Sequence, residues 1–236
     1  MPFKRDWDAT CPITWSQWEE DGVSWIIQDL PPQHDALAVD MLVEQFLPDE
    51  VMCNTTGVHK EPAGVADARL YWNGALGKRT SLACFRVIDG VKELVAANVC
   101  PVKCLNDDDD SGGIEQYKST SFLEVVKGLD YIEEKAQALQ VLGVDKYLGG
   151  AGLVVRRDAR GARLGGRLLQ AREPLCRHLG IDATVTTFTV PPSQKLATKV
   201  GFKLLTEVSF SELSEAGLNF PKDSDIVMKV MAKMYK

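Results

Sequence analysis

Apolar and polar residues recur with two different periods along this chain, and the periods predict strands interspersed with helices. Apolar runs bounded by turn residues predict about seven strands, over residues 23–30, 81–88, 91–102, 146–155, 181–189, 202–210 and 225–235. Apolar residues three or four positions apart predict helices over residues 33–47, 121–139, 164–179 and 191–199. This order of elements indicates an α/β protein (α+β, with a mixed sheet), built as one layered domain over residues 1–236.

Single residues sharpen the ends and turns of these elements. Asp89-Gly90 predicts a hairpin turn between the second and third strands. Ser121 and Glu124 have the spacing of a capping box at the start of the second helix. Pro174 is expected to kink the third helix, because proline lacks an amide hydrogen and crowds the preceding turn.

Two segments do not fit a regular element well. The strand over residues 146–155 contains three glycines, and glycine inside a strand often marks a bulge or the close approach of a ligand. Residues 48–78 carry Gly, Pro and Asn at turn density, so we expect a long loop there, part of it helical. Loops of this length in compact domains are usually functional or mobile.

Composition narrows the class of protein without identifying it. The chain has 236 residues, of which 45% are hydrophobic and 25% charged, as in an ordinary globular protein. A net charge of -6 argues against general affinity for nucleic acid or for an anionic membrane surface. Residues 1–10 have no apolar stretch of the kind found in signal peptides, and no stretch of 18 residues lacks charges. We therefore expect a cytoplasmic protein.

Metal and disulfide chemistry are not expected. The six cysteines are scattered without Cys-x-x-Cys spacing, and the three histidines show no metal-ligand spacing. Cys176 shares a helix face with leucines and is expected to pack in the core. His178, late in the same helix, suits a cap, whereas His59 in the long segment could serve substrate or a proton relay.

Residues 160–166 are the strongest candidate for a ligand site. A strand ends, a polar turn follows, and a helix begins among glycines, which directs unpaired backbone N–H groups and the helix dipole at one point. Five arginines between residues 156 and 167 add positive charge for a polyanion in an otherwise acidic chain. The alternative is a plain strand–helix connection with arginines on a solvated face. The glycine spacing fits neither a P-loop nor a dinucleotide-binding Gly-x-Gly-x-x-Gly motif.

This run resembles motif A of the GNAT superfamily, whose Gln/Arg-x-x-Gly-x-Gly/Ala signature wraps the pyrophosphate of coenzyme A. Arg160 matches the leading basic residue and Gly165 the final glycine, while Arg163 stands in place of the first glycine. Residues 193–202, ending in Gly-Phe, resemble motif B of the same superfamily. Residues 175–180 and 188–202 look like insect arylalkylamine N-acetyltransferases, and weaker similarity covers residues 23–235.

The resemblance implies a GNAT fold, a mixed central sheet flanked by helices, and acetyl-CoA as cosubstrate with no metal. It implies a cofactor-binding set made of the strand backbone and the glycine-containing loop: Leu153, Val154, Val155, Arg160, Gly161, Ala162, Arg163, Leu164, Gly165, Gly166 and Ser193. The implied reaction is direct transfer of acetyl to a small primary amine, an arylalkylamine, in a ternary complex.

Three residues are the catalytic candidates. Glu50 resembles the Glu of the Asp-Glu-Pro segment in the insect enzymes, where it is the proposed base; here Val51 replaces the proline, and Asp49 is the second choice. A solvated acidic end of the first helix is the alternative for Glu50. Ser193 could protonate the departing thiolate or cap the helix after Pro191-Pro192. Thr189 could act beside it or be structural.

The amine itself is left open by the sequence. Tyr71 and Trp72 could line an aromatic pocket or anchor the long segment to the core. Residues 106–113 carry four consecutive aspartates, Asp107 to Asp110, which read as a solvated acidic loop rather than a metal site. They could also attract a polyamine, so polyamine or protein acetylation remains an alternative. A non-catalytic acyl-CoA binder is the other, and the oligomeric state is not predicted.

Overall fold

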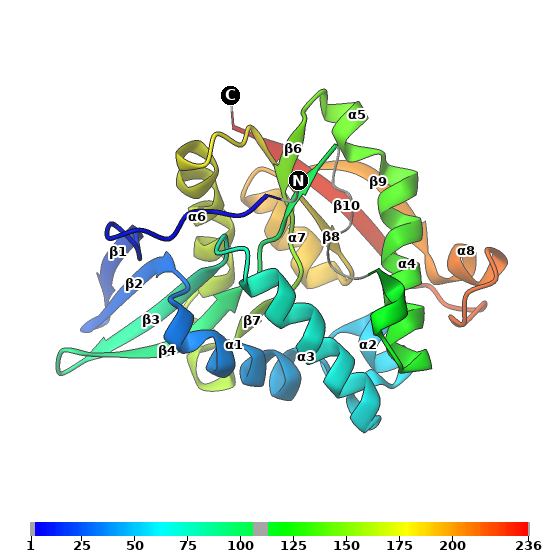
Figure 1. Ribbon diagram of the computed structural model, residues 1–236, viewed down its shortest axis with the longest axis horizontal. Coiled ribbons are helices and arrows are strands. Elements are labelled where there is room, and N and C mark those ends of the chain that lie inside the picture. Colours follow the sequence, from blue (N-terminus) through cyan, green and yellow to red (C-terminus); the bar gives the residue numbers. More distant parts are fainter. Residues whose placement is uncertain (1–2, 106–112, 236) are drawn as a thin grey trace.

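The computed structural model describes residues 3–105 and 113–235 as two five-stranded sheets covered by helices (Figure 1). Sheet A has the order β1-β2-β3-β4-β7 and sheet B the order β5-β6-β8-β10-β9. The strands are β1 Thr14–Glu20, β2 Val23–Asp29, β3 Leu82–Ile88, β4 Val91–Asn98, β5 Val102–Cys104, β6 Lys146–Leu148, β7 Leu153–Val155, β8 Ala183–Phe188, β9 Lys203–Ser209 and β10 Val227–Met234. The α/β expectation is confirmed, with ten short strands where about seven were expected.

The helices connect and cover these strands. They are α1 Asp35–Met41, which continues as a π-helix over Leu42–Phe46, α2 Val51–Thr56, α3 Pro62–Leu76, α4 Thr120–Ala136, α5 Ala138–Leu142, α6 Leu164–His178, α7 Pro191–Lys199 and α8 Phe210–Glu215. Short 3-10 turns occupy Pro32–His34, Val58–Lys60, Ile114–Gln116 and Arg157–Ala159. α6 stays one helix through Pro174.

The apolar core lies in two layers on opposite faces of sheet A. On one face, α6 packs Leu164, Leu168 and Leu175 against residues of β2, β3 and β4. On the other face, α1 packs against β4 and α3, α3 packs against α4, and α4 extends this core to β9 and β10 of sheet B. Apolar periodicity predicted these faces, because burying a continuous apolar stripe is the main driving force for each helix.

The hairpin at Asp89-Gly90 forms as predicted, with antiparallel register from Leu82↔Asn98 to Ile88↔Val91. The predicted strand over residues 146–155, in contrast, is two strands. β6 pairs with β5 and β8 in sheet B, whereas β7 pairs with β4 in sheet A. The intervening Gly149-Gly150-Ala151-Gly152 carries the chain from one sheet to the other, and the three glycines are the sequence signal of that crossing.

Residues 48–78 differ most from expectation, because they are mostly helical rather than a long loop. α2 and α3 occupy most of the segment, and Glu61 precedes Pro62 at the first position of α3, where proline is favoured. At the start of α4 the cap is Ser119 and not Ser121, since Ser119 accepts the N–H of Phe122. The Ser121 hydroxyl instead donates to Glu61.

Candidate active site

A cavity of about 320 Å³ lies between the two sheets and the helices α2, α3 and α4. Its wall is built by residues far apart in sequence: from α2 and the residues just before it, from α3 and α4, from the 149–153 crossing, from β8 and from the start of α7. All three catalytic candidates, Glu50, Thr189 and Ser193, are on this wall. The fold therefore brings together what the sequence separates by more than a hundred positions.

Glu50 lies at the start of α2. The sequence had instead indicated the end of the preceding helix. Glu50 Oε2 accepts the backbone N–H of Cys53 at 2.8 Å, so Glu50 is the N-cap of α2. This is the favourable end of a helix for a carboxylate. Its Oε1 is buried and has no hydrogen-bond partner. A buried polar oxygen without a partner requires an explanation, and a ligand that donates a proton there supplies one.

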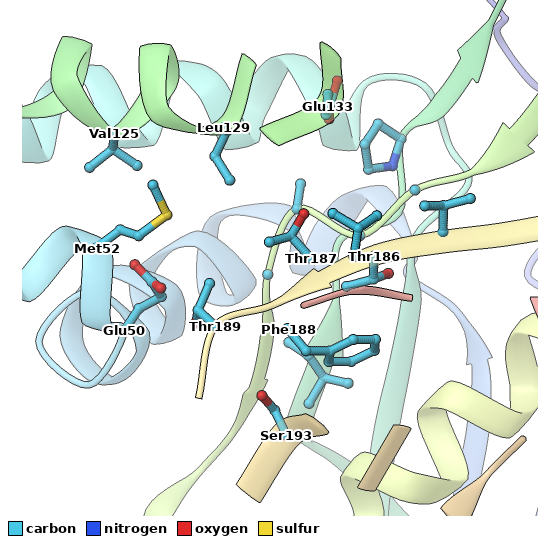
Figure 2. Close-up of a pocket in the computed structure, with 18 of the residues that line it drawn as sticks. Glu50, Met52, Val125, Leu129, Glu133, Thr186, Thr187, Phe188, Thr189 and Ser193 are labelled. Carbon is cyan, nitrogen blue, oxygen red and sulfur yellow. The ribbon is translucent and has the colours of Figure 1, made fainter. Parts of the chain in front are cut away.

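Thr189 and Ser193 flank Glu50 at the end of β8 and in the first turn of α7. Figure 2 shows Glu50 with Thr189 beside it and Ser193 on the adjoining helix turn. The Ser193 hydroxyl donates to the carbonyl of Val190 at 2.8 Å. Val190 is the N-cap of α7 and makes no side-chain cap bond, so Ser193 does not cap the helix. Ser193 instead bonds back across the first turn of α7, and its catalytic role stays a prediction.

The far wall of the cavity is apolar. Val125 and Leu129 of α4 lie opposite Glu50 and Thr189, and Met52 of α2 lies between Glu50 and α4 (Figure 2). Tyr71 and Trp72 also line it, but from α3 and not from a loop. The Trp72 indole donates to the carbonyl of Ala151 at 2.8 Å, which ties α3 to the crossing segment, while burial raises the pKa of Tyr71 to about 12.

Charged groups lie at the end of the cavity away from Glu50. Lys103 of β5 and Glu133 of α4 form an ion pair there, with an N···O distance of 3.1 Å. Closer to Glu50, burial and the carboxylate beside it hold the pKa of the Cys53 thiol well above its usual value. That thiol stays protonated and is a poor nucleophile.

β7 presents an open strand edge beside the cavity. It is the last strand of sheet A, paired with β4 on one side only. Val99 donates to Gly152 O and Arg156 donates to Val95 O, so residues 152 and 156 are bonded toward β4. Because antiparallel pairing alternates, the backbone groups of Leu153 and Val155 point away from β4, to the open edge. This is the backbone that the sequence predicted would contact a ligand.

The loop before α6 forms the predicted helix N-terminus. α6 begins at Leu164, and its N-cap, Arg163, makes no side-chain cap bond, which leaves the first-turn N–H groups available to a ligand. Arg163 adopts the left-handed conformation, φ 57° and ψ 20°, so the residue in place of the motif's glycine keeps a backbone shape typical of glycine. A Cβ on Gly166 would lie 3.2 Å from Leu196 of α7, so this glycine also permits close packing of α6 and α7.

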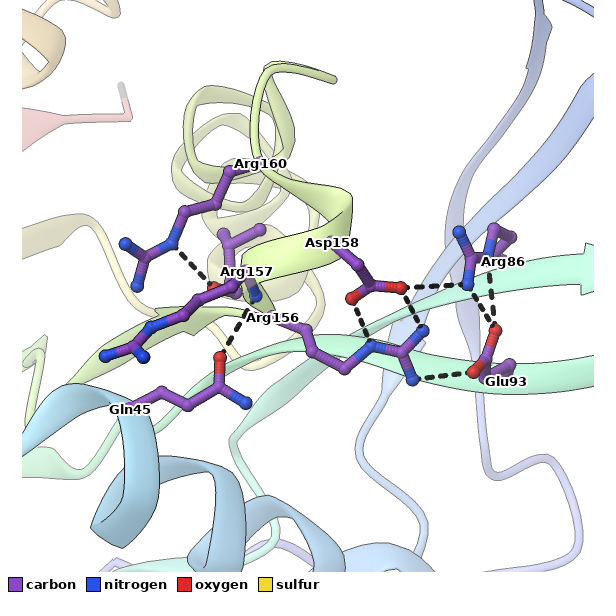
Figure 3. Close-up of polar contacts among 8 residues, drawn as sticks. Gln45, Arg86, Glu93, Arg156, Arg157, Asp158 and Arg160 are labelled. Atoms are coloured by element: carbon purple, nitrogen blue, oxygen red, sulfur yellow. Dashed lines mark hydrogen bonds and ion pairs between the residues drawn. The ribbon is translucent and has the colours of Figure 1, made fainter.

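The five arginines around this loop do not act alike. Arg156 is bound to Asp158 and Glu93 in an ion-pair network with Arg86, on the side away from Arg160 (Figure 3). This network lowers the pKa of Asp158 to about 2, chiefly through its hydrogen bonds with Arg156. Arg160 donates to Val155 O and pairs with Asp49 at 2.9 Å.

Arg163 and Arg167 both approach Glu20 of β1. Arg167 also stacks on Trp18, with 4.1 Å from the guanidinium carbon to the ring centroid. Arg157, Arg160 and Arg163 are therefore the arginines with the most exposed side chains near the helix N-terminus. Asp49, the second choice for the base, pairs with Arg157 and Arg160 and is not among the residues that line the cavity.

Sequence reasoning missed two polar residues of the cavity wall, Asn98 and Arg172. Arg172 is 1% exposed and donates to Asn98, Thr184 and Thr186. A signal existed, because Arg172 falls between Leu168 and Leu175 on the apolar stripe of its helix, at positions spaced by four and three.

The remaining candidates fall outside the cavity. Cys176 is buried in the core as expected, and His178 packs edge-on against Trp15. His59 is not a wall residue, and its Nδ1 is buried without a partner. Asp107 to Asp110 lie outside the described residues. Within the described part of the chain, no group of His, Cys, Asp and Glu is placed to hold a metal, and no helix is long and apolar enough to cross a membrane.

Comparison with known proteins places this fold. No protein-family model and no curated protein sequence matches the chain. Among solved structures, a putative arylalkylamine N-acetyltransferase 7 from the yellow fever mosquito has 29% identity and a TM-score of 0.89, with 99% of this chain and 100% of that chain covered. Arylalkylamine N-acetyltransferase 2 of Aedes aegypti has 16% identity and a TM-score of 0.76, covering 90% and 99%.

A Drosophila melanogaster polyamine N-acetyltransferase that forms N-acetylagmatine has 18% identity and a TM-score of 0.74, covering 89% of this chain and 99% of that one. At these lower identities the likeness is one of fold. The mosquito protein at 29% identity superposes over nearly the whole of this chain. The chain therefore has the GNAT fold and is similar over nearly its whole length to insect arylalkylamine N-acetyltransferases.

Proposed function

We propose that this protein is an acetyl-CoA-dependent N-acetyltransferase whose acceptor is a small primary amine, an arylalkylamine. The observation that carries the proposal is the buried, unpartnered Oε1 of Glu50 in the wall of a cavity that also reaches the open edge of β7. A proton acceptor and a strand edge free to bind an acyl donor thus meet in one space. The resemblance to N-acetyltransferases over the whole chain supports this assignment.

The donor is bound by backbone and arginines. The first-turn N–H groups of Leu164, Gly165 and Gly166, with the side chains of Arg160 and Arg163, form an anion site for the pyrophosphate. The outward backbone groups of Leu153 and the N–H of Val155, whose carbonyl accepts from Arg160, receive the pantetheine arm. Acetyl-CoA supplies the activated acetyl group.

Glu50 acts as the general base. A free alkylamine has a pKa near ~10, so the amine must lose a proton before or during attack. Oε1 is in place to accept it, while the bond from the Cys53 N–H to Oε2 keeps the carboxylate oriented. Ser193 then donates its hydroxyl proton to the departing thiolate, which requires the hydroxyl to turn from Val190 O, and its oxygen regains a proton from solvent; Thr189 lies beside Glu50 and Ser193.

Transfer is direct, from donor to amine in a ternary complex. Cys53 is the thiol nearest Glu50, and the raised pKa of this thiol argues against an acyl-cysteine intermediate.

The cavity wall favours an aromatic amine over a polyamine. Between Glu50 and the Lys103–Glu133 pair it is lined by Met52, Val125 and Leu129, which suit a ring. A second cation on the acceptor would have to compete with Lys103 for Glu133. Loss of that pairing would offset the gain.

One panel of measurements tests the proposal. Acetyl-CoA binding is measured by calorimetry, and CoA release is followed with dopamine, tryptamine, histamine and agmatine as acceptors. We expect binding and turnover with the aromatic amines. Turnover with agmatine in preference would identify a polyamine enzyme, binding without turnover would identify a non-catalytic acyl-CoA protein, and no binding would refute the proposal outright.

A further inference from the structure

Arg172 occupies the junction where the two sheets separate. It lies in the middle of α6, is 1% exposed, and is the largest of the fully buried side chains. Nε donates to Asn98 Oδ1 at 2.9 Å, and Nη1 donates to the hydroxyls of Thr184 at 3.1 Å and Thr186 at 2.6 Å. Asn98 belongs to β4 in sheet A, and the two threonines belong to β8 in sheet B. One guanidinium therefore bonds both sheets.

The partners of Arg172 pass this connection to the crossing segment. Asn98 Nδ2 donates to Gly152 O at 2.9 Å, and the Thr184 hydroxyl donates to Leu148 O at 2.7 Å. Leu148 is the last residue of β6, and Gly152 immediately precedes β7. Both ends of the 149–151 segment are thus tied, through one intermediate side chain each, to the same buried arginine.

Gly150, in the middle of the segment, touches the guanidinium itself. A Cβ at this position would lie 2.7 Å from Arg172 Nη2 and 2.5 Å from Thr186 Oγ1. Real Cβ atoms do not approach so closely, so the absence of a side chain lets the backbone rest against the arginine. The planar guanidinium thus presents Nε to Asn98, Nη1 to the two threonines and Nη2 to Gly150. A lysine ammonium on a flexible stem cannot reproduce this arrangement.

We infer that Arg172 is a positioning residue: it fixes the 149–152 crossing relative to β8, and so sets where the open edge of β7 meets the acyl donor. This inference rests on the proposed function. It assigns Arg172 no contact with the reacting atoms. It explains why a guanidinium is buried among neutral oxygens at this place. Separate uncharged side chains could each make one hydrogen bond there, but they would not link the two sheets through one rigid group.

Arg172→Lys tests the geometry while keeping the charge. Arg177→Lys, on the exposed side of the same helix in an i,i+4 pair with Glu173, is the matched control. We expect kcat/KM for acetyl-CoA to fall roughly 100-fold in Arg172→Lys, because a displacement of about 1 Å at a distance from the chemistry can cost that much. The control should keep wild-type kinetics.

A local readout separates positioning from general destabilisation. Amide hydrogen exchange should accelerate in residues 148–153 of Arg172→Lys but not in β3, at a temperature well below the unfolding midpoint. Thr184→Val, which keeps the shape and removes the hydroxyl, should show the same local change with a smaller kinetic loss. If Arg172→Lys does not fold, Thr184→Val decides alone.

Wild-type kcat/KM and wild-type exchange over residues 148–153 in whichever of these variants folds would overturn the inference. Uniformly faster exchange in all elements would also overturn it, because that is the result of a structural role only. Failure of the proposed function is a different result, since wild-type protein would then neither bind acetyl-CoA nor turn over. In that case the exchange measurement still tests whether Arg172 holds the crossing segment.

Discussion

Glu50→Gln against Asp49→Asn is the sharpest perturbation of the site, because two adjacent carboxylates have different surroundings. Glu50 lines the cavity, with Oε2 bound to the Cys53 N–H and Oε1 buried without a partner, whereas Asp49 is paired with Arg160 outside the cavity wall. In Glu50→Gln the amide oxygen can still accept the cap bond, so the helix start is kept. The nitrogen facing the cavity cannot accept a proton.

The expected size of the effect follows from these roles. A positioned general base contributes roughly 10²- to 10⁴-fold, or about 3–5 kcal/mol of transition-state stabilisation. Loss of an N-cap costs about 1 kcal/mol of stability, and Glu50→Gln should lose less than that because the cap bond is retained. We therefore expect kcat/KM for the amine to fall at least about 100-fold, with little change in the unfolding midpoint.

The assay is initial-rate CoA release across a range of pH, with thermal unfolding of each variant alongside. Asp49→Asn should stay within a few-fold of wild type in kcat, since its exposed ion pair with Arg160 is worth about 0–1 kcal/mol. Near wild-type kcat/KM at every pH in Glu50→Gln would refute the base assignment. A large loss in Asp49→Asn alone would transfer the role to Asp49.

Three further outcomes follow from features outside the catalytic pair. Arg163→Gly should raise the unfolding midpoint by roughly 1–3 °C. The left-handed backbone conformation costs a non-glycine residue about 1–2 kcal/mol, and the greater freedom of glycine in the unfolded chain offsets about 0.4–1 kcal/mol of that gain. A lower midpoint on thermal unfolding would contradict this. With a thiol reagent, native protein should label at Cys11 and Cys104 only, because the other four thiols are buried and have raised pKa values; fast labelling of a third thiol by mass spectrometry would be inconsistent with the packing. The pKa of Asp158 is lowered from 3.8 to about 2. Its pairing with Arg156 therefore stabilises the fold fully at pH values above the ordinary pKa, and this stabilisation is lost as the pH falls toward the lowered pKa. The midpoint of Asp158→Asn should therefore lie below wild type near neutral pH and converge with it in strong acid; a difference that persists unchanged would contradict the linkage.

Elements set by local pattern were predictable from sequence. α7 begins and ends at the residues expected, because Pro191-Pro192 and Gly201 bound it. β1 was missed, since its apolar residues, Trp15 and Trp18, are three positions apart rather than alternating, and it is only half-buried at the edge of sheet A. Arg167 of α6 stacks over Trp18 of β1, and this contact between distant segments is not contained in any local sequence pattern.

Site residues that belong to a sequence motif could be predicted, whereas residues placed in the site by tertiary contacts could not. The resemblance selected Glu50, but not its position at the start of α2. The Gly, Pro and Asn content of residues 48–78 indicated a loop where the chain turns into that helix. Arg172 was overlooked because arginine on an amphipathic helix usually faces water. Its place on the apolar stripe indicates burial, but its partners on β4 and β8 follow only when the two sheets are placed against one another around α6.

The open edge of β7 has a meaning for solubility as well as for catalysis. An unpaired strand edge is a template on which another chain can extend a sheet, and exposed edges of this kind promote aggregation. Here the edge is three residues long, and Leu153 lies in the wall of the internal cavity rather than on the outer surface. A neighbouring molecule has too little strand to pair with, whereas a slender ligand can still enter. The protein thereby keeps backbone groups ready for binding without offering them to copies of itself.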